Sequence, residues 1–330
     1  MKATLDKLFR FDKLGREEAQ KLLTHLAQGG YNTSQVAAFL STYRMRAITL
    51  DELMGFREAM LELCVPLNLD GFDTIDLCGT GGDGKNTFNI STVASFIVAG
   101  AGIKVVKHGN YGVSSVCGSS NILEYFGYHF KNDETMLKIE LEKAGICFLH
   151  APKFHPAMKN IAPVRRDLGV KTFFNILGPI VNPSRPKNQL IGVYSLELAR
   201  TYHYLYQKLD KNYAIVHSLD GYDEISLTSP AKVYSTNGEK ILTSSQFGYP
   251  LLQPDDITGG NDIRTSAELF IDLLEGKGTP EQQAVATANA GLALQIMLPH
   301  KSLSHCVETA RETLLQGKAL QSFKTLINMQ

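Results

Sequence analysis

The amino-acid sequence predicts an α/β protein with a small helical bundle at its N-terminus. Residues 1–66 place apolar side chains at helical spacing, as Leu22, Leu23 and Leu26 do. From Phe72 onward, short apolar segments alternate with helical ones, a pattern typical of a mainly parallel sheet with crossover helices. We therefore expect a helical domain at 1–66 and a larger α/β domain at 72–330.

Start and stop signals define the individual elements. Thr49-x-x-Glu52 is a capping box, Thr279-Pro280 is a helix start, and Asn237-Gly238 indicates a hairpin turn. Segment 152–186 interrupts the strand and helix alternation with prolines. The expected strands cover 74–77, 103–106, 146–149, 190–194 and 213–216, and the expected helices of this part cover 90–101, 120–126, 133–144, 196–209, 261–275, 279–298 and 302–315.

Composition excludes several classes of protein. The chain has 330 residues, with 33 Lys plus Arg against 33 Asp plus Glu, so no global charge attracts nucleic acid or an anionic membrane. The five cysteines are scattered without metal-type pairing, and an odd number argues against a full disulfide framework. No segment has the ~20 apolar residues of a membrane span. We expect a cytoplasmic protein that binds neither nucleic acid nor membranes.

The stretch from Asp76 to Thr92 carries the strongest functional signal. An apolar strand runs into Gly79, Gly81, Gly82 and Gly84, which permit positive φ and close approach to a ligand. Asn89, Ser91 and Thr92 follow at the start of a helix, where N–H groups and the helix dipole favour an anion. The stretch therefore predicts a phosphate site.

Three other interpretations of this loop remain open. Gly79-x-Gly81-x-x-Gly84 fits a dinucleotide fingerprint, but the next strand ends in Lys107 and His108 instead of a ribose-binding acid. Gly79-x4-Gly84-Lys85 fits a P-loop until Asn86, where a Ser or Thr is needed. An ordinary strand-to-helix turn needs fewer glycines.

A second polar loop follows the next expected strand, from Lys107 to Ser120. Because the carboxyl ends of neighbouring parallel strands meet at one sheet edge, both loops can line one crevice. Lys107 adds positive charge, and Ser115 and Ser119 are candidate donors to phosphate oxygens. A flexible surface loop is the alternative. Two anion sites side by side suggest a ligand with two phosphate groups.

Two further charged pairs stand out. Asp223 and Glu224 follow the strand that ends at Val216, and hard oxygen ligands beside phosphates point to Mg²⁺. Arg165 and Arg166 lie in segment 152–186, and an arginine fork is suited to a carboxylate. Taken alone, a solvated acidic turn and a surface arginine pair are the simpler interpretations.

At these residues the chain resembles the anthranilate phosphoribosyltransferase family, which joins anthranilate to 5-phosphoribosyl 1-diphosphate in tryptophan biosynthesis. The resemblance covers essentially the whole chain, and its motifs occur in the family's order. They are Gly79-Thr-Gly-Gly-Asp83-Gly, Thr87-Phe-Asn89-Ile-Ser91-Thr92, Lys107-His-Gly-Asn110, Ser114-Ser115, Gly118-Ser119, His155-Pro-Ala-Met-Lys159, Arg165-Arg166, Phe174-Asn175-x-Leu177-Gly-Pro179-x-x-Asn182-Pro183 and Asp223-Glu224-Ile-Ser226.

The resemblance implies a helical domain that segment 152–186 rejoins, an active site in the cleft between the domains, and a homodimer. It implies Asp223, Glu224 and Lys107 as catalytic residues, and Ser91, Asp223 and Glu224 as ligands of two Mg²⁺ ions per subunit. Gly79, Asn110 and Arg165 would bind anthranilate. The residues implied for 5-phosphoribosyl 1-diphosphate are Gly79, Gly82, Asp83, Thr87, Asn89, Ile90, Ser91, Thr92, Lys107, His108, Gly109, Asn110, Ser114, Ser115 and Ser119.

One departure and two competing functions accompany this expectation. Tyr111 and Val116 stand where the family usually carries Arg and Lys, which removes positive charge from the second loop. A pyrimidine nucleoside phosphorylase has a similar architecture, but Asp223-Glu224 and Lys107-His-Gly-Asn110 disfavour it. A non-catalytic relative that binds phosphoribosyl ligands or nucleic acid is the other alternative.

Overall fold

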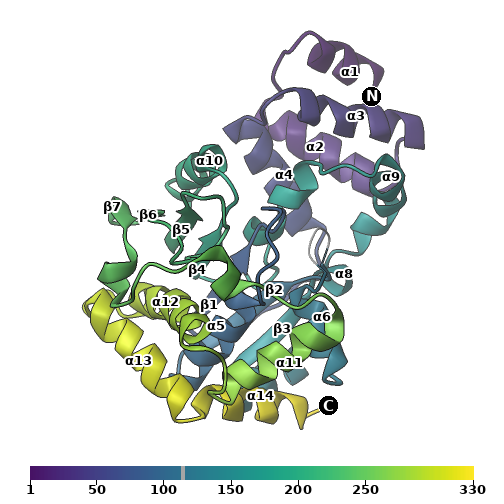
Figure 1. The fold of residues 1–330 in the computed structure, drawn as a ribbon. Helices are drawn as coiled ribbons and strands as arrows, with labels where there is room; N and C mark the ends of the chain where they lie inside the picture. The colour runs from purple at the N-terminus through teal and green to yellow at the C-terminus, as the bar shows by residue number, and fades with distance from the viewer. Residues whose placement is uncertain (113–115) are drawn as a thin grey trace. The chain divides into compact units, whose positions relative to one another are not determined.

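The computed structural model describes residues 1–112 and 116–330, which divide into two compact units. One unit is helical and comprises Met1–Leu67 and Ala151–Pro183. The other comprises Asn68–His150 and Ser184–Gln330 and contains a seven-stranded sheet (Figure 1). The expected fold class, a helical bundle with a larger and mainly parallel α/β domain, is confirmed. In the described part of the chain, no helix has the length and apolar character to cross a membrane.

The helical unit is built from short helices with well-defined caps. The side chains of Asn32 and Thr49 accept the N–H groups of Gln35 and Glu52, so Asn32 and the predicted cap residue Thr49 each begin a helix. The helices are α1 (Lys2–Phe9), α2 (Arg16–Ala27), α3 (Thr33–Met45), α4 (Leu50–Glu62), α8 (Ala151–Phe154) and α9 (Ala162–Leu168), with 3₁₀ turns at Pro156–Asn160, Phe173–Ile176 and Gly178–Ile180.

Aromatic packing joins the returning segment to the N-terminal helices. Phe173 stacks on Phe56 of α4 with ring centroids 4.6 Å apart and meets Phe39 of α3 edge-on at 5.7 Å. The N–H of Val65 donates to the carbonyl of Phe154 at 2.8 Å. Aromatic pairs of this geometry add about 0.5–1.5 kcal/mol each beyond their buried area. The segment therefore shares the core of the helical unit.

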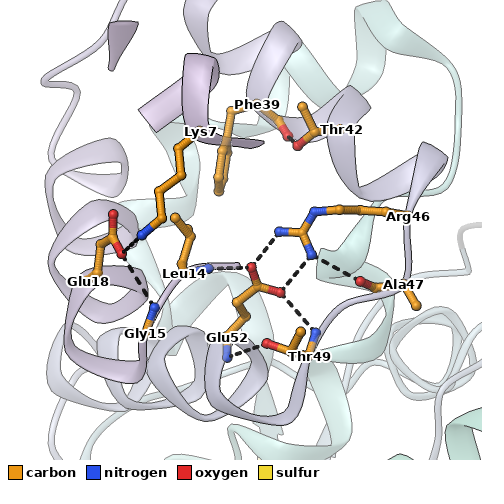
Figure 2. A network of polar contacts seen from close by, with 10 residues as sticks. All are labelled: Lys7, Leu14, Gly15, Glu18, Phe39, Thr42, Arg46, Ala47, Thr49 and Glu52. Carbon is orange, nitrogen blue, oxygen red and sulfur yellow. Dashed lines mark hydrogen bonds and ion pairs between the residues drawn. The ribbon is translucent and has the colours of Figure 1, made fainter. Parts of the chain in front are cut away.

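A buried ion pair organises the loops of this unit (Figure 2). Glu52 is fully buried, and its carboxylate accepts the N–H of Leu14 at 3.0 Å, the N–H of Thr49 at 2.9 Å and two guanidinium N–H groups of Arg46. Burial raises the pKa of Glu52, but the hydrogen bonds from Arg46, Leu14 and Thr49 outweigh it, so the net pKa is lowered. The carboxylate is therefore held ionised.

The sheet has the strand order β3-β2-β1-β4-β5-β6-β7. The first five strands in this order are mutually parallel, and the β6–β7 hairpin extends the sheet antiparallel beside β5. Strands β2 and β3 are added in turn on one side of β1, and β4 pairs with β1 on its other side. The strand order therefore reverses between β1 and β4. The strands are β1 (Thr74–Gly79), β2 (Lys104–Gly109), β3 (Ile146–His150), β4 (Asn188–Gly192), β5 (Asn212–Ser218), β6 (Ala231–Ser235) and β7 (Gly238–Leu242).

Helices cover both faces of the sheet (Figure 1). Leu190, Ala214 and Val216 share one apolar core with α5 and α12, whereas Tyr206 of α10 donates to Gln189 on the opposite face at 2.7 Å. This alternation follows from the two-residue period of a strand. The helices are α5 (Ile90–Gly100), α6 (Ser119–Tyr125), α7 (Glu134–Ala144), α10 (Leu196–Tyr206), α11 (Ile263–Leu274), α12 (Pro280–Met297), α13 (Leu303–Leu315) and α14 (Lys318–Ile327).

Several expected bounds are wrong by two or more residues. The strand expected at 190–194 begins at Asn188 and ends at Gly192, and the strand expected at 103–106 continues to Gly109. Both errors arise because polar residues and glycine are rarely assigned to strands from sequence, whereas here they pair with a neighbouring strand. Helix α14 is absent from the sequence prediction. It packs on α5 and α7 through Ala319, Phe323 and Leu326, which recur at helical spacing, so the signal was present in the sequence and was overlooked.

We predict that Arg46→Ala lowers the free energy of unfolding of the helical unit by about 3–5 kcal/mol, because it leaves the Glu52 charge buried without its partner. Urea unfolding followed by circular dichroism measures the loss. The exposed neighbour Arg44 is the matched control, and Arg44→Ala should change stability by no more than about 0.5 kcal/mol. Equal effects of the two substitutions would contradict this interpretation of the ion pair.

Candidate active site

The first loop begins at Gly79, the last residue of β1, and leads to the start of α5 at Ile90. Gly81, Gly82 and Gly84 have φ values of 62°, 78° and 75°, which side chains rarely tolerate. The N–H of Thr80 donates to the carbonyl of Gly192 at 2.9 Å, so the loop starts at the strand-order reversal. The expected glycine-dependent geometry is present.

The first loop ends at the N-terminus of α5, where an anion is favoured. Asn89 is the N-cap residue, but its side chain makes no cap hydrogen bond. Its amide instead donates to the carbonyl of Cys117 in the second loop at 2.9 Å. The two loops that the sequence places at one sheet edge are therefore in direct contact.

Hydrogen bonds to the Asn121 side chain and one backbone hydrogen bond close the second loop. The N–H groups of Gly112 and Gly118 both donate to Oδ1 of Asn121 at 3.0 Å, and the N–H of Ser120 donates to the carbonyl of Asn110 at 3.1 Å. Ser114 and Ser115, two of the predicted phosphate contacts, lie outside the residues that the structure describes.

The Lys107 side chain bridges β2, β1 and α5 beneath the loops. It is 2% exposed, and its Nζ donates to the carbonyl of Leu77 at 2.6 Å and to Oγ of Ser91 at 3.3 Å. Burial lowers the pKa of Lys107, and the charge of Asp76 raises it in part. The lysine thus brings its amine next to Ser91.

The acidic turn, which carries Asp223 and Glu224, follows β5 and contacts the first loop. The carboxylate of Asp223 accepts the N–H of Gly81 at 2.7 Å. Burial and then the charge of Asp83 raise the pKa of Asp223 to about 7. Burial and then the charge of Asp223 also raise the pKa of Glu224, which Lys107 and a hydrogen bond from Ser91 offset in part. Four predicted residues, Ser91, Lys107, Asp223 and Glu224, therefore interact with one another.

Two glycines allow this close approach. A Cβ atom at position 192 would lie 1.5 Å from the carbonyl oxygen of Asp223, and one at position 79 would lie 2.6 Å from Oδ2 of Asp223. Gly79 and Gly192 are paired at the carboxyl ends of β1 and β4. The acidic turn thus lies directly on the two strand ends where the strand order reverses, the usual ligand position in open α/β sheets.

Comparisons with known proteins identify the family. Residues 2–64 match the helical bundle domain of the glycosyl transferase family, and residues 71–320 match its a/b domain. Anthranilate phosphoribosyltransferase of Flavobacterium psychrophilum is 56% identical over 326 residues, covering 99% of this chain and 98% of that protein. The Bacteroides thetaiotaomicron protein of the same name is 48% identical over 329 residues, covering 100% and 99%.

The chain belongs to the anthranilate phosphoribosyltransferase family. The crystal structure of the Thermus thermophilus member has a TM-score of 0.91 at 31% identity and covers 98% of each chain. The solved structure of the Saccharomyces cerevisiae member in complex with PRPP and Mg has a TM-score of 0.91 at 25% identity, covering 100% of this chain and 98% of the other. The expected family and its enzyme class, a pentosyl transferase, are confirmed.

The predicted family residues fall into three groups. The first group belongs to the sheet unit and lies at or after the carboxyl ends of its strands. The second group, Ser114 and Ser115, lies outside the described residues. The third is Arg165, which lies in the helical unit. In the sheet unit, the first loop carries Gly79, Gly82, Asp83 and Thr87, the start of α5 carries Asn89, Ile90, Ser91 and Thr92, and β2 with the loop and helix after it carries Lys107, His108, Gly109, Asn110 and Ser119.

Arg165 lies on α9 with its guanidinium 5.2 Å from the centre of the Phe174 ring. It is half-buried, and burial alone accounts for the lowering of its pKa. No carboxylate of the described residues contributes to that shift. A desolvated guanidinium without a protein carboxylate suits an anionic ligand.

At Tyr111, where the family usually has Arg, the chain uses a different contact. The hydroxyl of Tyr111 donates to Glu124 of α6 at 3.0 Å, and its ring meets His150 of β3 edge-on at 4.9 Å. Val116, which replaces the family Lys, is 49% exposed. In this chain, position 111 therefore holds the second loop to the protein instead of supplying charge.

The acidic turn and Ser91 fit a magnesium ion. Burial raises the pKa of both carboxyl groups of the turn, and the negative charges of Asp83 and Asp223 raise it further, so a cation would relieve that repulsion. No group of three or more His, Cys, Asp or Glu side chains forms a metal cage within residues 1–112 and 116–330. Mg²⁺ needs none, because it binds one or two carboxylates together with substrate oxygens and water.

Sequence reasoning assigned no role to Asp76, Ser218 or Asn289. Asp76 is fully buried in β1, where its Oδ1 accepts the N–H of His108 at 3.2 Å. Beyond Ile75 and Val105 the regular pairing of β1 with β2 stops, so this side chain joins the two strands instead. A charged residue inside an apolar strand was the available signal.

We predict that the stability of Asp223→Asn relative to wild type rises between pH 5 and pH 8 in metal-free buffer. The pKa of Asp223 is about 7 in the folded chain and about 3.9 in an unfolded one. Between these values the folded chain holds a proton that the unfolded chain has released, so wild-type stability falls as pH rises.

Thermal melting followed by circular dichroism at the two pH values measures this difference. Asp167→Asn, at an exposed aspartate of the helical unit, is the control and should keep a constant offset from wild type. A constant offset for Asp223→Asn as well would show that Asp223 does not titrate in this range.

Proposed function

We propose that this chain transfers the phosphoribosyl group of 5-phosphoribosyl 1-diphosphate to the amino nitrogen of anthranilate, as its relatives' names indicate. The observation that carries the proposal is the contact between the glycine loop, Ser91, Lys107 and the acidic turn at the strand-order reversal. The bond between ribose C1 and the diphosphate oxygen breaks and a C1–N bond forms with inversion. Diphosphate leaves, and the amine releases one proton.

The chain's own residues would act mainly by placement. The loop N–H groups and the start of α5 would bind the phosphates, and Lys107 would add positive charge beside the leaving group. An aromatic amine is already neutral at pH 7, so no strong general base is required. Holding the amine nitrogen close to ribose C1 would then supply much of the rate acceleration.

Two Mg²⁺ ions per subunit, held by Ser91, Asp223 and Glu224, would supply positive charge to the diphosphate oxygens as the bond breaks. Gly79, Asn110 and Arg165 would bind anthranilate, with Arg165 on its carboxylate. Gly82, Asp83, Thr87, Asn89, Ile90, Thr92, His108, Gly109 and Ser119, together with Ser114 and Ser115, would complete the site for 5-phosphoribosyl 1-diphosphate.

We also infer a cytoplasmic homodimer formed through the helical unit. Phe9 on α1, Phe11 after it and Met45 on α3 are 58%, 65% and 78% exposed, and α1 packs against α3. Exposed apolar side chains on helices that pack together favour a protein partner. All five cysteines are free thiols, which supports a reducing compartment.

The fluorescence of anthranilate tests the reaction directly. It should fall when the protein, 5-phosphoribosyl 1-diphosphate and Mg²⁺ are combined, and persist when any one of them is omitted. No decline with folded protein would favour a non-catalytic relative, whereas phosphorolysis of thymidine would favour the nucleoside phosphorylase alternative.

We predict that Arg165→Ala raises the KM for anthranilate about 10- to 100-fold, because a hydrogen-bonded charge contact is worth about 1.5–3 kcal/mol. The KM for 5-phosphoribosyl 1-diphosphate should change little. Steady-state kinetics measure both constants. The exposed neighbour Arg166 provides the matched control, and Arg166→Ala should keep the wild-type KM. An unchanged anthranilate KM in Arg165→Ala would refute the carboxylate assignment.

A further inference from the structure

The backbone of the acidic turn is held by a side chain from a distant helix. Asn289 lies in the middle of α12 and is fully buried. Its Oδ1 accepts the N–H of Ile225 at 3.0 Å, and its Nδ2 donates to the carbonyl of Ile225 at 2.9 Å. Buried backbone groups need hydrogen-bond partners. One amide therefore satisfies both polar backbone groups of the residue next to Glu224.

The opposite side of the same turn is held by Ser218, the last residue of β5. Its Oγ donates to the carbonyl of Glu224 at 2.6 Å and accepts the N–H of Ser226 at 3.2 Å. The segment Glu224–Ile225–Ser226 has no regular helix or strand of its own. Its backbone is thus fixed by two side chains, one from the sheet and one from α12.

Helix α12 is itself fixed against the elements that carry the rest of the site. It packs on β4, on β5 and on α5, whose first turn carries Ser91. Gly291 lets α13 approach closely, because a Cβ there would lie 2.6 Å from a methyl carbon of Val307. Ser91, Gly192, Glu224 and Asn289 also line one small pocket. Asn289 therefore links the acidic turn to the helix that holds Ser91.

The two hydrogen bonds of Asn289 to Ile225 hold the backbone of a turn whose side chains carry neighbouring negative charges. Asp223 and Glu224 are adjacent carboxylates with Asp83 nearby, and their repulsion favours a turn that opens. Holding the backbone in place before the cation arrives removes an ordering cost from binding.

We propose that Asn289 is a positioning residue that, together with Ser218, presets Asp223 and Glu224 for divalent cations. The cation's role rests on the proposed function, and Asn289 acts through the backbone of Ile225. Its removal should weaken cation binding even in protein that remains folded. Changes to the polar contacts of supporting residues typically cost about 10- to 100-fold in metal affinity.

Mn²⁺ binding in the presence of diphosphate, read from the electron paramagnetic resonance signal of free Mn²⁺, tests this proposal without using turnover. Asn289→Ala should weaken Mn²⁺ binding about 10- to 100-fold. Amide hydrogen exchange of the peptide containing Ile225 should also accelerate in that variant. Its KM for anthranilate should remain that of wild type.

The matched control is Thr287→Ala, on the same helix. Thr287 is 1% exposed and its hydroxyl is bonded to Tyr249 at 2.6 Å and to the carbonyl of Gln283 at 2.7 Å, away from the acidic turn. This variant should lose stability and keep wild-type Mn²⁺ affinity. Wild-type Mn²⁺ affinity in folded Asn289→Ala, or an equal loss in Thr287→Ala, would overturn the proposal.

A second variant covers the case in which Asn289→Ala does not fold. Ser218→Ala removes the other pair of hydrogen bonds and should also weaken Mn²⁺ binding, and unchanged affinity there overturns the proposal equally. A failure of the proposed function would look different. Wild-type protein would then bind Mn²⁺ with diphosphate but leave anthranilate fluorescence unchanged, and the comparison between Asn289→Ala and Thr287→Ala would still decide the positioning role.

Discussion

The backbone carbonyl of Asp223 lies so close to the end of β4 that only glycine fits at position 192. The same turn places the Asp223 carboxylate against Gly79 at the end of β1 and within a hydrogen bond of Gly81. The phosphate loop and the acidic turn therefore share one surface. Every later feature of the site depends on this contact, because it fixes the carboxylates relative to the loop that would hold the phosphates.

The sheet topology explains why this contact occurs where it does. The strand order reverses between β1 and β4, which is the usual ligand position in open α/β sheets. The turn after β5 lies on these strand ends, and Lys107 from β2 donates to the carbonyl of Leu77 and the hydroxyl of Ser91. Positive and negative groups thus meet at one strand edge, and burial shifts the pKa values of both.

The sequence predicts the parts of this arrangement whose signals are local. Glycines after an apolar strand, polar residues at a helix start and an Asp-Glu pair after another strand can be recognised without coordinates. The contacts of Asn289 and Ser218 cannot be recognised from the sequence, because each depends on how elements distant in the chain pack together. Asn289 is separated from Ile225 by 64 residues, and only the packing of α12 on the sheet brings them together. The extra length of β2 was missed for a related reason, since pairing with β3 retains His108 and Gly109 in the strand.

The kinetics of Gly192→Ala show whether the reaction depends on the contact between the acidic turn and the end of β4. A Cβ at this position must displace the Asp223 backbone, so turnover of anthranilate should fall by about 100-fold or more. The circular dichroism spectrum and the anthranilate KM should change little. Wild-type turnover in Gly192→Ala would contradict the account, because the acidic turn would then not need its place on the end of β4.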